Sequence, residues 1–67
     1  MEKYVCEVLV RKDKSGKIVR LGGALCSEVI IVQANSETFA KQVAWSKYAK
    51  EHGVSTSMIS IGKVTKM

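Results

Sequence analysis

The sequence has no proline, one histidine and two cysteines in 67 residues. Two cysteines are too few for the disulfide framework of a small secreted scaffold. The N-terminal residues lack the long apolar stretch and the small-residue cleavage site of a signal peptide. The longest uninterrupted apolar run, residues 29–32, is far shorter than the ~20 residues that a membrane-spanning helix requires. We therefore expect a cytoplasmic protein that does not cross a membrane.

Side chains that catalyse reactions are scarce. The single histidine, His52, falls at the C-terminal end of a predicted helix, where a protonated imidazole interacts favourably with the last carbonyl groups. The six acidic residues are scattered singly and form no recognisable pair of carboxylates. Cys6 and Cys26, with one distant histidine, do not reproduce the spacing of zinc ligands. We therefore expect no catalytic residues, no metal site and no cofactor, and hence a protein that is not an enzyme.

Both cysteines fall on predicted strands. Cysteine is among the residue types most often buried as a small hydrophobe, so we expect inert buried thiols. A disulfide between Cys6 and Cys26 remains the alternative, and it requires a shift of two residues in the register of the predicted hairpin.

The composition is that of a small folded protein with an excess of positive charge. Hydrophobic residues make up 46% of the chain, which is enough for folding. A length of 67 residues predicts a single domain over residues 1–67, and so small a core would benefit from a partner or from self-association. Eleven Lys and Arg against six Asp and Glu give a net charge of +5, which favours association with anions.

Alternating apolar residues predict a first strand over about residues 3–11. The polar segment 12–17 follows, in which Asp13 can bond its own backbone and Gly16 can take a positive φ angle. This segment therefore predicts the turn of a β-hairpin.

The return strand is expected over residues 17–33. Gly22 and Gly23 interrupt it, because residues without side chains weaken a regular strand and often mark a bend. Either one kinked strand or two short ones follow. Residues 29–32 are all apolar, which is typical of a strand that is covered on both faces.

A helix is predicted over residues 36–52. Asn35 or Ser36 can cap its start, and Gly53 stands where a left-handed C-terminal cap would. The stripe that faces the sheet is expected to contain Ala40, Val43, Ala44 and Tyr48. Residues expected outside this stripe or at its edge are Phe39, Trp45 and Ala49.

A last strand is predicted over residues 57–65, where Ile59 and Ile61 alternate with polar or small residues. A right-handed crossover through the helix can return this strand beside the first one. The predicted fold class is therefore α+β with the order β-β-α-β. The antiparallel sheet has three strands, or four if the second strand is split, and one helix packs on one face.

Positive charge is most concentrated around the predicted hairpin. Five of the eleven Lys and Arg residues lie within ten positions there: Arg11, Lys12, Lys14, Lys17 and Arg20. A projecting basic hairpin could contact phosphates or an acidic protein surface. The same charges also have a purely structural interpretation, because a hairpin tip is polar and edge lysines suppress unwanted strand pairing.

Lys41 and Trp45 form a second candidate contact, on the helix. A tryptophan outside the main stripe can stack on a base or anchor a protein interface. It can equally cover the edge of the sheet, because tryptophan is commonly buried in large part but not fully. The predicted strands lack the aromatic residues of an RNA-recognition sheet, so we do not expect base-specific readout.

The layout of a strand hairpin, an alanine-rich helix and a final strand resembles that of many small ribosome-associated, phage-borne and plasmid-borne proteins, and this likeness fixes no function. We expect a small non-enzymatic basic module that binds nucleic acid through phosphate contacts. The alternative is a phage- or plasmid-type inhibitor or adaptor, for example one directed against a host defence, that occupies the surface of a partner protein. A homodimer, formed sheet to sheet or by edge strands, could also cover the excess apolar surface.

Overall fold

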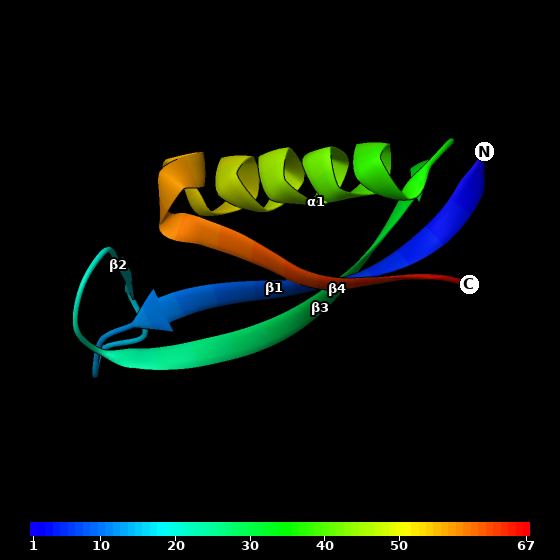
Figure 1. The fold of residues 1–67 in the computed structure, drawn as a ribbon. Helices are drawn as coiled ribbons and strands as arrows, with labels where there is room; N and C mark the ends of the chain where they lie inside the picture. The colour runs from blue at the N-terminus through cyan, green and yellow to red at the C-terminus, as the bar shows by residue number, and fades with distance from the viewer.

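The computed structural model describes residues 1–67 as four strands, one α-helix and one short 3-10 helix. In chain order the elements are β1 (Glu2–Lys12), β2 (Ile18–Val19), β3 (Ala24–Ala34), α1 (Glu37–His52), η1 (Thr56–Met58) and β4 (Ile59–Lys66). All strand pairs are antiparallel, and α1 packs on one face of the sheet (Figure 1). The predicted β-β-α-β fold is confirmed, in its four-stranded form.

β1 lies at the centre of the sheet. β3 pairs with one edge of β1 along its whole length, from Glu2 to Lys12. β4 pairs with the other edge between Tyr4 and Val10. The crossover through α1 thus returns the last strand beside the first, as the sequence predicts.

The second predicted strand is split at Gly22 and Gly23, and its two parts lie on opposite edges of β1. β2 pairs with Arg11 and Lys12 on the same edge as β4, whereas β3 takes the other edge. The chain between them therefore crosses the end of β1 (Figure 1). Gly23 permits this crossing because its φ angle is +63° and a Cβ atom there would collide with the backbone carbonyl of Lys12.

α1 begins and ends where the sequence indicates. The Ser36 hydroxyl accepts a hydrogen bond from the backbone N–H of Phe39 at 3.2 Å, and Gly53 closes the helix with a left-handed φ angle of 64°. Glu37 in the first turn suits the positive end of the helix dipole. No helix of the protein combines the length and the apolar character needed to cross a membrane.

The stripe of α1 that faces the sheet is made largely of alanine. Its buried residues are Ala40, Ala44, Tyr48 and Ala49. Val43 is half-buried. The prediction that Ala49 lies outside the stripe is wrong, because the chain folds back after α1 and brings Val54 and Met58 against the cluster that contains Ala49.

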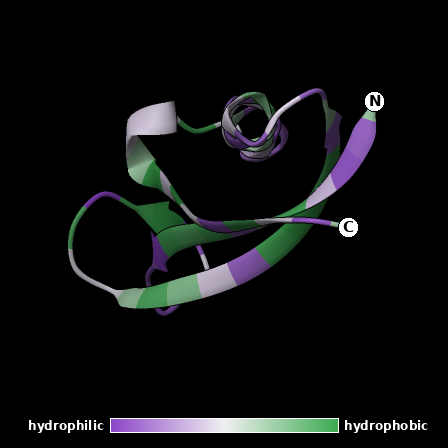
Figure 2. Ribbon diagram, turned by 45° about the vertical axis from the view of Figure 1, so that its right-hand side comes forward, coloured by the Kyte–Doolittle hydropathy of each residue, from purple (hydrophilic) through white to green (hydrophobic).

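The core lies between α1 and the sheet. Every second residue of β1 from Tyr4 to Val10 is buried beneath the helix, and no polar or charged residue is buried with them. The small side chains of Ala40 and Ala44 are fully buried, so α1 lies close to the strands. Figure 2 looks almost along α1 and shows one helical layer over one layer of sheet, with nothing on the opposite face.

The face of the sheet that points away from α1 is bare. Val29 and Ile31 are 62% and 51% exposed, whereas Val32, on the helix side, is buried. The prediction that residues 29–32 are covered on both faces is therefore wrong. A single helix of 16 residues covers only one face, and β3 is an edge strand rather than a central one.

Candidate functional site

The hairpin turn is held by the carboxylate of Asp13. Its Oδ1 accepts hydrogen bonds from the Ser15 hydroxyl at 2.6 Å and from the backbone N–H groups of Ser15 and Lys17 at 2.9 and 3.0 Å. These bonds, the one from the Ser15 hydroxyl first, hold the pKa of Asp13 below its ordinary value. The one acid of the hairpin is thus engaged by its own turn, and Lys14 and Lys17 stand exposed at the tip.

Arg11 and Arg20 line one hollow beside the hairpin. The hollow has a volume of about 150 Å³, an apolar wall and two further polar side chains, Ser57 and Ser60. Neither arginine forms an ion pair within the protein. Two arginines and two serines therefore line this hollow, and side chains of these types can bind an oxyanion such as phosphate by charge-assisted hydrogen bonds.

The C-terminal end of α1 lies against the hairpin. His52 and Gly53 line a second hollow together with Gly16 and Lys17. Lys50, in the last turn of α1, therefore lies at the same end of the molecule as the hairpin cations. We refer to these residues together as the basic end: Arg11, Lys14, Lys17, Arg20 and Lys50.

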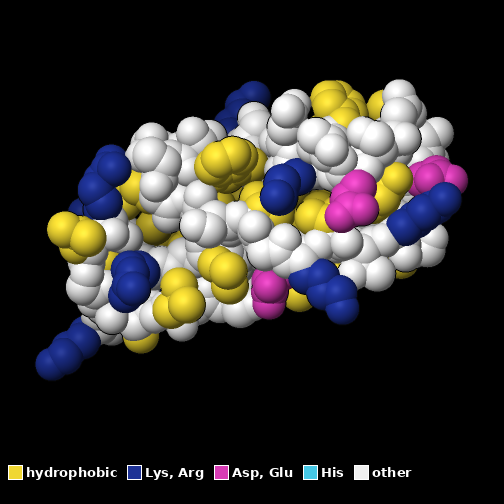
Figure 3. Space-filling view, in the orientation of Figure 1, with side chains coloured by type: hydrophobic (Ala, Val, Ile, Leu, Met, Phe, Trp, Pro, Cys, Tyr) yellow, Lys and Arg dark blue, Asp and Glu magenta, His cyan; other side chains and the backbone are white.

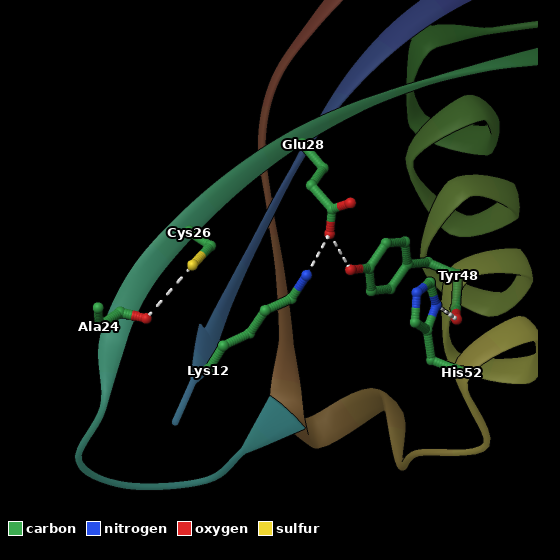
Figure 4. Close-up of polar contacts among 6 residues, drawn as sticks. All are labelled: Lys12, Ala24, Cys26, Glu28, Tyr48 and His52. Carbon is green, nitrogen blue, oxygen red and sulfur yellow. Dashed lines mark hydrogen bonds and ion pairs between the residues drawn. The ribbon is translucent and has the colours of Figure 1, made fainter. Parts of the chain in front are cut away.

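Lys12 turns away from the basic end, to the helix side of the sheet (Figure 4). Its Nζ lies 3.3 Å from Oε2 of Glu28, which also accepts a hydrogen bond from the hydroxyl of Tyr48. The bond from Tyr48, followed by that from Lys12, holds the pKa of Glu28 below its ordinary value. Burial and the bond to this carboxylate raise the pKa of Tyr48. Lys12 thus belongs to an internal cluster.

His52 completes this cluster from the end of α1. Its ring stacks on that of Tyr48 with 4.0 Å between the ring centroids. Its Nδ1 lies 3.0 Å from the backbone carbonyl of Tyr48, within hydrogen-bonding distance of the last turn. The position agrees with a capping role at the negative end of the helix dipole.

The two cysteines lie apart on the sheet. Cys6 is opposite Ile30 and Cys26 is opposite Val10, so the two are four positions apart in register, or about 13 Å along the strands. That separation excludes the alternative of a disulfide, and both thiols are free. Cys6 is buried, which raises the pKa of its thiol. The structure contains no group of three or more His, Cys, Asp or Glu that could hold a metal ion.

Lys41 and Trp45 are not brought together with the basic end. The indole N–H of Trp45 donates to the carbonyls of Thr56 and Ile59, both at 2.8 Å, so the side chain fastens the connection between α1 and β4. The residue is still 37% exposed. Lys41 lines a separate hollow near the start of α1, beside Glu37.

Most positive side chains are exposed without an ionic partner, whereas most negative side chains are bonded within the protein. Only Lys12 and Lys66 of the eleven Lys and Arg residues form ion pairs, and the other nine are exposed. Four of the six acids are bonded within the protein: Glu2, Glu7, Asp13 and Glu28. In Figure 3 the end of the molecule that carries the hairpin shows Lys and Arg side chains and no acidic ones on the visible face.

Apolar side chains gather on the bare face of the sheet, which we call the open face. Its apolar residues are Val5, Leu9, Leu25, Val29 and Ile31. Leu25 and Val29 are 63% and 62% exposed, and Glu7 lies among them, bonded to the Ser27 hydroxyl at 3.1 Å. The period-two pattern of the two long strands already places these residues on one face, but it does not reveal that the face lacks a cover.

Comparison with protein-family models, with curated proteins and with solved structures finds no match to this chain.

Proposed function

We propose that this protein is a small non-enzymatic module that binds the phosphate backbone of nucleic acids through its basic end. The observation that carries the proposal is the imbalance in unpaired charge. Nine cations are exposed without an ionic partner, whereas most carboxylates are bonded internally. Such cations release condensed counterions when they contact phosphates, which is the main source of sequence-independent affinity for nucleic acids.

The aromatic side chains favour backbone contacts over base contacts. Tyr4 and Tyr48 are buried, and the two partly exposed aromatic residues, Phe39 and Trp45, lie on α1 outside the basic end. The apolar residues of the open face are all aliphatic. Because base stacking on single strands depends on aromatic platforms, we expect affinity that depends on salt and little on sequence.

The expected salt dependence follows from the number of cations. Four phosphate contacts by Arg11, Lys14, Lys17 and Arg20 correspond to a slope of about −3.6 in log K against log salt concentration for duplex DNA. Raising the salt from about 50 to about 200 mM would therefore weaken binding roughly 100-fold. Fluorescence anisotropy with labelled single- and double-stranded oligonucleotides measures this slope directly.

The decisive variant is Lys14→Ala/Lys17→Ala/Arg20→Ala. It removes three cations of the basic end and leaves Lys12, which supports the internal cluster, in place. A matched control, Lys3→Ala/Lys41→Ala/Lys63→Ala, removes three unpaired exposed cations from elsewhere. We expect the first variant to reduce the slope by about 2.7 and the control to reduce it much less.

Equal losses in the two variants would show that net charge, and not the basic end, carries binding. No binding of either nucleic acid at about 50 mM salt would rule out the proposed function, because phosphate contacts are strongest at low ionic strength.

A protein-binding inhibitor or adaptor is the second candidate, and the open face is the observation that favours it. Leu25, Val29 and Ile31 are each more than half exposed on one side of the sheet. An apolar patch with charged residues around it is typical of a protein interaction surface. This candidate predicts that Leu25→Lys abolishes partner binding while the triple substitution in the basic end leaves it intact.

A further inference from the structure

β3 leaves one of its two edges without a partner. β1 pairs with the other edge along its whole length, so backbone N–H and C=O groups of alternate β3 residues are directed outward. With 11 residues at about 3.3 Å each, this free edge is about 36 Å long. It therefore runs along nearly the whole molecule, whose longest extent is 37 Å.

The sequence of β3 contains none of the features that usually protect such an edge. Ala24–Ala34 has no proline, glycine, lysine or arginine, and no bulge interrupts its pairing with β1. Its one charged residue, Glu28, is held on the helix side by Lys12 and Tyr48. The outer edge thus presents a regular, uncharged strand.

The opposite edge of the sheet, β4, is protected in the usual ways. β4 contains Lys63 and Lys66, and its pairing with β1 is shifted by a bulge between Cys6 and Val8. At this bulge the carboxylate of Glu7 accepts the backbone N–H of Lys63 at 3.3 Å. Edge lysines and bulges prevent strand pairing between molecules. One molecule therefore carries both a protected and an unprotected edge.

We propose that β3 pairs with β3 of a second copy, antiparallel about a two-fold axis, to form a homodimer with one continuous sheet. An isologous interface of this kind uses the same surface on both subunits. The paired strands form hydrogen bonds between the outward N–H and C=O groups of the two copies. The pairing also brings Val29 and Ile31 of one copy beside those of the other on the open face. Cross-strand pairs of β-branched residues stabilise a sheet.

The distribution of charge favours antiparallel over parallel pairing of the two copies. Each copy carries a net charge of +5, so close contact between two basic ends would be repulsive. The start of β3 lies at the basic end because Leu25 is opposite Arg11. Antiparallel pairing therefore places the two basic ends at opposite ends of the dimer.

The size of the contact sets the concentrations to test. A strip about 36 Å long and roughly 10 Å wide covers about 360 Å² on each copy. This is less than the ~800 Å² per partner of a standard stable interface, so the dimer should dissociate at low micromolar concentration. Sedimentation velocity from about 1 µM to about 1 mM covers the transition. We expect the mass to rise from 7.4 kDa to twice that value.

The variant Val29→Lys/Ile31→Lys tests the interface. Both residues are more than half exposed, so lysine is tolerated in the monomer, but the two-fold axis brings the new charges together. A matched control, Ser60→Lys/Thr65→Lys, adds the same charge to exposed residues of β4. We expect the β3 variant to weaken the dimer at least 10-fold and the control to leave it nearly unchanged.

Amide hydrogen exchange by NMR gives a second readout that does not depend on any variant. Dimerisation through the edge protects alternate amides of β3, namely those directed outward, and leaves the amides of β4 unchanged. A monomer at about 1 mM would overturn the proposal. So would a dimer without this alternating protection, or one that the control variant weakens as much as the β3 variant, because either result places the contact elsewhere.

Discussion

Removing the hydroxyl of Tyr48 should destabilise the protein in a way that depends on Glu28. In Tyr48→Phe the ring, which is buried and stacked on His52, keeps its packing. Only the hydrogen bond to the Glu28 carboxylate is lost. Glu28 keeps Lys12 as a partner, so the substitution leaves no isolated charge.

The size of the effect follows from the exposure of the carboxylate. A hydrogen bond to a charged group contributes about 1.5–3 kcal/mol when it is shielded from water. The Glu28 side chain is 41% exposed, so solvent screening lowers this contribution to about 1 kcal/mol. For a chain of this size that corresponds to a fall of roughly 4–8 °C in Tm.

The difference in the free energy of unfolding between wild type and Tyr48→Phe should depend on pH at both the acidic and the basic end of the range. Folding lowers the pKa of Glu28 from its ordinary 4.5, so its contribution is present above 4.5 and is lost as the pH falls through the lowered value. Folding raises the pKa of Tyr48 from its ordinary 10.0, so its contribution is present below 10.0 and is lost as the pH rises through the raised value. The difference is therefore largest between about pH 5 and 10.

Urea unfolding followed by circular dichroism at pH 3, 7 and 11 measures these differences. Tyr4→Phe is a matched control, because Tyr4 is also buried but its hydroxyl makes no hydrogen bond within the protein. A double-mutant cycle with Glu28→Gln isolates the coupling between the two side chains. Equal destabilisation of the two Tyr→Phe variants, or a Tyr48→Phe effect that is unchanged at pH 3, would refute the reasoning.

Two further predictions concern the connections. Gly23→Ala should lower the free energy of unfolding by about 3 kcal/mol, because the new Cβ would collide with the backbone of Lys12 and alanine is also strained at a positive φ angle. Gly22→Ala has open space around it and only the φ strain, so it should cost about 1 kcal/mol. Urea unfolding measures both values. Trp45→Phe should destabilise the protein by about 1–2 kcal/mol, because it loses the two hydrogen bonds of the indole N–H. Anisotropy titrations should show unchanged affinity for nucleic acid. A loss of affinity with unchanged stability would instead make Trp45 a contact residue.

Local sequence signals predicted the elements that depend on near neighbours. The helix follows from a cap at Asn35 or Ser36, which the structure places at Ser36, from Gly53 and from alanines at helical spacing. The first strand follows from its alternating pattern, and the turn follows from Asp13. These features need no knowledge of distant contacts, because caps and turns are satisfied by backbone groups within four residues.

The errors concern contacts between distant segments. The apolar run at residues 29–32 is the same whether a second layer covers it or not, so the sequence could not show that β3 is an exposed edge. The split of the second strand depends on which edge of β1 each half takes. The pairing of Lys12 with Glu28 needs the register of β1 and β3, and it removes one residue from the predicted basic hairpin.

The basic end and the free edge of β3 have a joint geometric consequence. In the proposed dimer the two basic ends lie at opposite ends of a paired strand about 36 Å long. One turn of B-DNA repeats after about 34–36 Å, so both ends can reach phosphates on the same side of a duplex. Two linked sites bind with higher avidity than one, while a flexible single strand lacks this fixed repeat. A dimer would therefore favour duplexes over single strands, and the basis of that preference would be spacing and not base recognition.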